Sequence, residues 1–211
     1  MLRQRFVSEL EDARKELIRM GEMVETALAS AVSGLVDSCQ SAAEAARALE
    51  PQIDAMHRSI HKRCLELVVL EAPVATDARL ITGVLESIVD LEQIGDYADH
   101  IAELALGFPQ IPFPAVKESL TRLGARVRGM LAGALESWRT LDRDSARSVR
   151  ASQETVERDY QVLFRQLGDL MTVPSNGTIP LSLVLVAKYL DRAGRHALNV
   201  AEQAAEASPQ H

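Results

Sequence analysis

A segment near the middle of this chain returns in degenerate form about 100 residues later. The first copy spans residues 91–103 and the second spans residues 190–202, and both keep a Leu, an acidic residue, a Gly and two Ala in the same register. Such an internal duplication restricts the fold to two copies of one structural unit packed together. The second copy has Arg195 where the first has Asp96, so we expect the halves to share a shape but not a chemistry.

The composition favours helices. The chain has 211 residues, of which 47% are hydrophobic and 25% are charged. This length and hydrophobic content are enough for one substantial core or for two small cores packed together. Aromatic residues make up only 4%, while straight-chain residues, which lose little rotamer freedom in a helix, are abundant. An all-α fold is therefore expected.

Charge and cysteine usage limit the location and the partners. A formal net charge of −7 repels nucleic acid and anionic lipid, and the sequence has no evident basic patch. The two cysteines, Cys39 and Cys64, each fall within a helical pattern, and the N-terminus has no apolar signal segment. The longest apolar run, residues 181–187, is interrupted by Lys188 and is far shorter than the roughly 20 residues needed to cross a bilayer. We expect a reduced, cytoplasmic protein with no nucleic-acid partner and no direct membrane insertion.

Apolar residues recur at alternating spacings of three and four in six segments, which predicts six helices in two sets of three. Three prolines break the pattern between the sets, because proline cannot continue a helix. The expected organisation is a first three-helix repeat over residues 1–107, a Pro-rich joint over 108–115 and a second repeat over 116–211, with a further loop at 173–180. Short connections favour two pseudo-symmetric antiparallel three-helix bundles packed side by side.

Acidic residues recur along two of the expected helices. The third helix carries a stripe of four, beside its apolar face: Glu92, Asp96, Asp99 and Glu103. The second helix carries a similar stripe: Glu50, Asp54, His57 and His61. Like charges that face each other need a counter-ion, and carboxylate and imidazole ligands suit first-row divalent metals or iron. The two stripes predict a metal cluster between these helices.

The same residues also fit ordinary structural roles. Acidic residues spaced by four are common on solvated helix edges, and the periodicity alone does not favour metal binding over such an edge. On the same grounds His57 and His61 fit a helix rim, and Cys64 fits core packing. Tyr160 and Trp138 fit the core or the interface between repeats.

Three segments resemble motifs of the PhoU family. Residues 91–98 resemble its L-E-R-I-G-D-x-A signature, residues 72–79 resemble its Q-P-V-A-x-D-L-R helix start, and residues 189–202 resemble its second-repeat Y-L-E-R-I-G-D-H-A-T-N-I-A-E. The duplicated three-helix layout and the length also match. The resemblance therefore covers nearly the whole chain.

The resemblance implies two bundles that each bind a multinuclear metal cluster through two E/D-x-x-x-D motifs. The first bundle keeps all four of these residues, and Asp99 on the same stripe is a fifth candidate ligand: Glu50, Asp54, Glu92, Asp96 and Asp99. The sequence does not identify the metal, because a carboxylate-rich site accepts iron, manganese, zinc, nickel or magnesium.

The second bundle departs from the family motif. The alignment places Gln153 and Glu157 opposite the first acidic pair, and Asp191 and Arg195 opposite the second. The guanidinium of an arginine is always cationic and does not ligate metal. Arg195 lies one helical turn after Asp191, a spacing at which opposite charges form ion pairs. We expect Arg195 to pair with Asp191 or Glu157 and to replace a metal.

The family acts as an accessory to the phosphate-specific ABC transporter and as a negative regulator of the phosphate-starvation response. The resemblance implies contacts with the transporter's ATPase subunit and with a sensor histidine kinase at the membrane. No Walker motif or Gly-rich phosphate loop is visible, so a regulator of phosphate homeostasis is expected and not an enzyme. A homodimer is suggested only by analogy with the family.

Two other classes of protein stay open. A di-metal carboxylate enzyme would need a Glu-x-x-His motif on each of two helices, whereas this chain has only the variant Asp54-Ala55-Met56-His57. A helical adaptor of another phosphate carrier, without a signalling role, would have the same fold.

Overall fold

The computed structural model describes residues 2–71, 75–107 and 110–208. The helices are α1 (Leu2–Val36), α2 (Gln40–Glu71), α3 (Ala75–Leu106), α4 (Pro114–Thr140), α5 (Arg143–Met171), a short 3-10 turn η1 (Pro174–Asn176) and α6 (Ile179–Ala207). No strand occurs within these described ranges. The expected all-α fold with six long helices is confirmed.

Two helices begin inside segments that the sequence assigns to loops. Helix α4 begins at Pro114, and Pro180 lies in the first turn of α6. Proline is accepted there because the first backbone N–H groups of a helix have no partner within the helix. The remaining turn before α6 includes Gly177, whose φ of 61° is readily adopted only without a side chain. Residues 108–109 of the expected joint, and residues 72–74 of the expected start of the third helix, lie outside the described residues.

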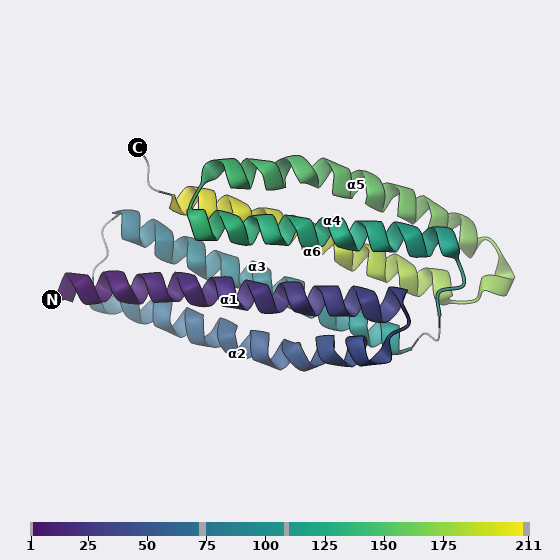
Figure 1. Ribbon diagram of the computed structural model, residues 1–211, viewed down its shortest axis with the longest axis horizontal. Coiled ribbons are helices and arrows are strands. Elements are labelled where there is room, and N and C mark those ends of the chain that lie inside the picture. Colours follow the sequence, from purple (N-terminus) through teal and green to yellow (C-terminus); the bar gives the residue numbers. More distant parts are fainter. Residues whose placement is uncertain (1, 72–74, 108–109, 209–211) are drawn as a thin grey trace.

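The six helices form two bundles that lie side by side (Figure 1). Helices α1, α2 and α3 pack on one another, and α4, α5 and α6 do the same. The bundles join through two helix pairs, α1 with α4 and α3 with α6, while α2 and α5 lie on opposite outer sides. The expected side-by-side arrangement is confirmed.

Two glycines let α1 and α4 approach closely. A Cβ on Gly21 would lie 2.1 Å from Leu135 Cδ2, and a Cβ on Gly124 would lie 2.9 Å from Val32 Cγ1. The two glycines are equivalent positions of the two repeats, and so are the two aliphatic residues that cover them. Because α1 and α4 run in opposite directions (Figure 1), the two contacts are related by a pseudo-two-fold axis between the bundles.

One apolar core runs through both bundles. The buried Trp138 of α4 ties them together, since its Nε1 lies 3.1 Å from both Ser87 Oγ on α3 and the Val200 carbonyl oxygen on α6. Of the two places expected for Trp138, the core or the interface between repeats, it occupies both. Cys64 is buried in the core as expected, and burial raises the pKa of its thiol to about 11. Cys39 is not helical, because its N–H donates to the Gly34 carbonyl in the turn that ends α1.

Candidate metal centre

The acidic pairs of the first repeat flank a point where α2 and α3 approach closely. A Cβ on Gly95 would lie 3.2 Å from Ile53 Cγ2, so the two backbones are close at this crossing. Each helix places one acidic residue three positions before the crossing residue and one directly after it: Glu50 and Asp54 on α2, Glu92 and Asp96 on α3. The structure thus brings the four sequence-predicted carboxylates to one crossing.

The pKa of Asp96 is shifted by its burial and by the carboxylates around it. Its pKa is raised, first by burial and then by the neighbouring charge of Glu92, with smaller contributions from Glu50 and Asp54; His100 acts in the opposite direction. All four carboxylates are half-buried. An excess of negative charge in a partly desolvated place favours the binding of a cation. These residues therefore fit a metal ion chemically.

Other side chains already contact part of this set. Arg58 Nη1 donates to Asp54 Oδ2 at 2.6 Å, and Gln93 Nε2 donates to Glu92 Oε2 at 3.0 Å. Asp99, the fifth candidate, accepts from Arg47 Nε at 3.0 Å. Within the described part of the chain, no three His, Cys, Asp or Glu side chains form an arrangement that would hold a metal ion as they stand. Metal binding by these five residues stays a prediction.

The two histidines of the α2 stripe lie further along that helix. His61 is exposed and His57 is half-buried, with their ring centroids 6.2 Å apart. The Nε2 atom of His57 is buried and has no hydrogen-bond partner within the described residues. Both positions agree with the expected place at the rim of the helix, although the buried Nε2 atom of His57 is unpaired in the part of the chain that the structure describes.

The second repeat reproduces the crossing with different chemistry. A Cβ on Gly194 would lie 3.3 Å from Val156 Cγ1, so α5 and α6 approach as α2 and α3 do. The residues that flank this crossing are those that the alignment places there: Gln153 and Glu157 on α5, Asp191 and Arg195 on α6.

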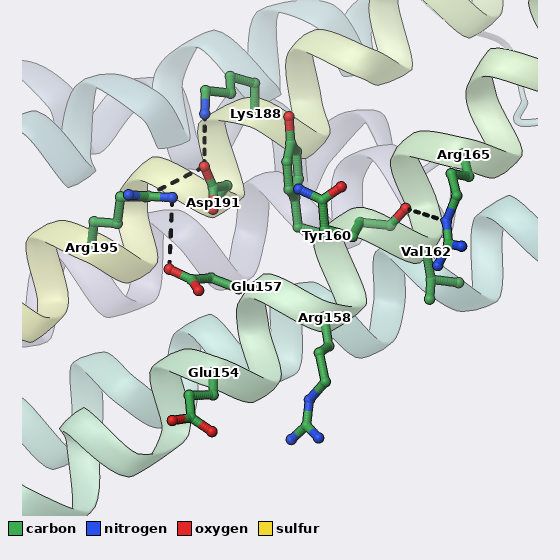
Figure 2. Close-up of a pocket in the computed structure, with 10 residues that line it drawn as sticks. Glu154, Glu157, Arg158, Tyr160, Val162, Arg165, Lys188, Asp191 and Arg195 are labelled. Carbon is green, nitrogen blue, oxygen red and sulfur yellow. Dashed lines mark hydrogen bonds and ion pairs between the residues drawn. The ribbon is translucent and has the colours of Figure 1, made fainter.

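Arg195 lies between the two acids of its repeat (Figure 2). Its guanidinium lies 3.6 Å from Asp191 Oδ2 and 3.7 Å from Glu157 Oε1. The expected ion pair is therefore confirmed with both partners. Lys188 is a cation that sequence reasoning missed: its Nζ donates to Asp191 Oδ2 at 2.8 Å. The available signals were its spacing of three residues from Asp191 and its position at the end of an otherwise apolar run.

Comparison with known proteins identifies the repeated unit. The family model described as the PhoU domain matches residues 17–105 and 120–204, once in each bundle. The chain belongs to the PhoU family. It is 34% identical over 201 residues to the "Phosphate-specific transport system accessory protein PhoU homolog" of Pseudomonas aeruginosa. The alignment covers 94% of this chain and 83% of that protein.

Other PhoU proteins support the same assignment. The chain is 30% identical over 200 residues to the "Phosphate-specific transport system accessory protein PhoU" of Escherichia coli K12, covering 93% of this chain and 82% of that protein. The crystal structure of PhoU from Pseudomonas aeruginosa superposes with a TM-score of 0.90 at 33% identity, covering 94% of this chain and 96% of that one. The expected two-bundle PhoU fold is confirmed.

The two PhoU repeats also meet through polar and aromatic side chains of α3 and α6. His196 Nδ1 lies 2.6 Å from Asp90 Oδ1, and the rings of Tyr97 and Tyr189 stack with centroids 5.6 Å apart. Tyr97 and His196 are equivalent positions of the duplicated segment, and so are Asp90 and Tyr189 on the preceding turns. The two contacts are therefore pseudo-two-fold mates. Sequence reasoning missed them, although the duplication itself was the signal.

None of the helices in the described part of this PhoU chain is long and apolar enough to cross a bilayer.

Proposed function

We propose that this protein is the accessory protein of a phosphate-specific ABC transporter and a negative regulator of the phosphate-starvation response. The observation that carries the proposal is the PhoU match in both repeats, together with relatives named as accessory proteins of the phosphate-specific transport system. The protein acts by binding and not by catalysis. It works in the cytoplasm, as a homodimer, and reaches the membrane only through its partners.

The proposed partners are the ATPase subunit of the transporter and the sensor histidine kinase of the phosphate response. When phosphate is plentiful, the protein holds the kinase in its inactive signalling state. A protein of net charge −7 has little attraction to anionic lipid, so association with the membrane depends on these protein contacts.

We also propose that the first repeat binds a divalent metal or an iron cluster through Glu50, Asp54, Glu92 and Asp96. The support is the raised pKa of Asp96 among partly buried carboxylates, because a cation would neutralise them. The metal would be iron, manganese, zinc, nickel or magnesium. Asp99 joins the ligand set only by leaving its ion pair with Arg47.

Deletion of the gene tests the regulatory role. In phosphate-rich medium, the deletion strain should express phosphate-starvation genes that the parent strain represses, as measured with a transcriptional reporter. A plasmid copy of the wild-type gene should restore repression. Normal repression with altered phosphate uptake would instead identify an adaptor of a phosphate carrier without a signalling role.

A further inference from the structure

A groove lies between α5 and α6 of the second repeat, with a volume of about 790 Å³ (Figure 2). Four cationic side chains line it, two from each helix: Arg158 and Arg165 on α5, Lys188 and Arg195 on α6. Three acidic side chains also line it: Glu154, Glu157 and Asp191. Tyr160 and Val162 provide part of its remaining wall. No basic run marks this groove in the sequence, because its cations come from two helices.

The two arginines of α5 lack acidic partners. Arg158 donates to Thr155 Oγ1 and Arg165 donates to the Gln161 carbonyl oxygen, both on their own helix. Within the described residues, neither forms an ion pair, whereas Lys188 and Arg195 share the acids of the crossing. Arg158 and Arg165 are seven residues apart and therefore lie on one face of α5. This face has two guanidinium groups available to carboxylates.

Large apolar side chains are exposed beside these cations. Val162, between the two arginines, is 38% exposed. On α6, Leu181 and Leu185 are 52% and 44% exposed and share a helical face with Lys188. The region thus combines exposed apolar surface with positive charge, on a protein whose net charge is negative.

The first repeat has no equivalent of this surface. At the positions that correspond to the four cations of the groove it has Ala55, Lys62, Val89 and Asp96. The groove is therefore not a by-product of the duplication. It is a specialisation of the second repeat.

The residues along the groove indicate the kind of ligand better than its size does. Its volume lies within the range of roughly 300 to 1,000 Å³ that is typical of sites for small organic ligands. Cations and apolar side chains that alternate along two helices match the pattern by which grooves accept an amphipathic helix. Arg158 and Arg165, which form no ion pair within the described residues, favour a helix that carries acidic residues.

We infer that the α5–α6 groove binds an acidic amphipathic helix of a protein partner. Carboxylates of that helix pair with Arg158 and Arg165, and its apolar side chains cover Val162 and Leu185. The inference rests on the proposed function, since it assigns a surface to the partner contacts through which this protein is proposed to act.

The test measures binding of the full chain to the purified ATPase subunit and to the cytoplasmic part of the sensor kinase. The variant Arg158→Glu/Arg165→Glu should raise the dissociation constant for one of these two proteins by about tenfold or more, because the charge reversal replaces attraction with repulsion. The control Arg143→Glu/Arg147→Glu makes the same charge change on α5 outside the groove and should leave affinity within about twofold. Circular dichroism checks that both variants are folded.

The outcomes separate this inference from the proposed function. If the wild type binds neither protein, the proposed partner contacts are wrong. If the wild type binds and the groove variant binds equally well, the groove inference is overturned and the proposed function stands. Binding to phosphatidylglycerol vesicles is measured in parallel. If the groove variant loses affinity for the vesicles but not for the two proteins, the groove inference is also overturned.

A photo-crosslinker supplies a second measurement that does not depend on charge reversal. With p-benzoylphenylalanine in place of the exposed Val162, illumination of the complex should link the groove to a partner segment rich in acidic residues with apolar residues at helical spacing. A cross-link to a segment without acidic residues contradicts the inference.

Discussion

At the residue scale, one position distinguishes the two repeats most clearly. Asp96 lies among carboxylates that raise its pKa, while Arg195 at the equivalent position pairs with the acids around it. An arginine compensates negative charge permanently, whereas an aspartate adds to it and leaves the compensation to a proton or a bound cation. The two crossings therefore differ in charge, since the second has a cation at the position where the first has a further carboxylate.

Replacing Asp96 by Asn tests the metal proposal. The folded-state pKa of Asp96 is raised above the unfolded value, so the metal-free protein loses stability as the pH rises through that interval. The Asn variant should lack this pH-dependent loss and be at least as stable as wild type without metal at pH 7. It should also bind less metal and gain less stability from added metal.

Metal content by plasma mass spectrometry and thermal unfolding with and without metal check these results. Equal metal content in wild type and in a Glu92→Gln/Asp96→Asn variant would exclude the site. As a control, Asp144→Asn replaces an exposed acid in the first turn of α5 and should change neither the metal content nor the stability gained from added metal.

Asp191 gives a second prediction at this scale, because its side chain is only 1% exposed and depends on two cations. Lys188 lies within hydrogen-bond distance of it at 2.8 Å, whereas Arg195 lies at 3.6 Å and is more than half exposed. Lys188→Met should therefore destabilise the protein by about 2 kcal/mol, and Arg195→Met by less than about 1 kcal/mol. Urea unfolding measures both, and the reverse order would show that the arginine is the main partner.

At the element scale, the sequence predicts most of the architecture, because each long helix buries a continuous apolar stripe. The periodicity locates all six helices, and the glycines of the duplicated segment mark the crossings at Gly95 and Gly194. The contacts that depend on how helices rotate against one another are not predictable in this way. His196 on Asp90 and the α5–α6 groove belong to that group, whereas Lys188 lies three residues from Asp191 on the same helix.

The gathering of acids at the candidate metal centre was predictable only in part. Helical spacing places the four acids of α2 and α3 on neighbouring stripes, and the structure brings them together. The spacing of four residues is compatible with the Arg58–Asp54 pair on α2, but it does not reveal that Arg47 of α2 pairs with Asp99 of α3.

The α1–α4 contact gives a prediction about packing. Gly21→Ala should lower stability by about 1 kcal/mol, because the clash with Leu135 exceeds the gain in helix propensity. Gly129→Ala, in the same pair of helices, meets nothing within 4 Å and should raise stability by roughly 0.5 to 1 kcal/mol. In a Leu135→Ala background the cost of Gly21→Ala should vanish. If Gly21→Ala still lowers stability in the Leu135→Ala background, the clash involves a residue other than Leu135.

At the scale of the whole molecule, the shared core predicts cooperative unfolding of both repeats. Trp138 is the only tryptophan, and its contacts with α3 and α6 make its fluorescence a reporter of the docking of the bundles. Urea transitions measured by this fluorescence and by helical circular dichroism should coincide. A fluorescence transition at lower urea would mean that the bundles separate before they unfold.

The pseudo-two-fold contacts carry a consequence for how such a molecule diversifies. In a symmetric homodimer of three-helix chains, every substitution appears twice, and an aspartate changed to arginine would alter both crossings at once. Covalent fusion of the two halves removes that coupling. One copy is then free to carry a guanidinium where the other carries a carboxylate, and to present arginines along a groove. The glycine-mediated contacts hold the two copies together in either case.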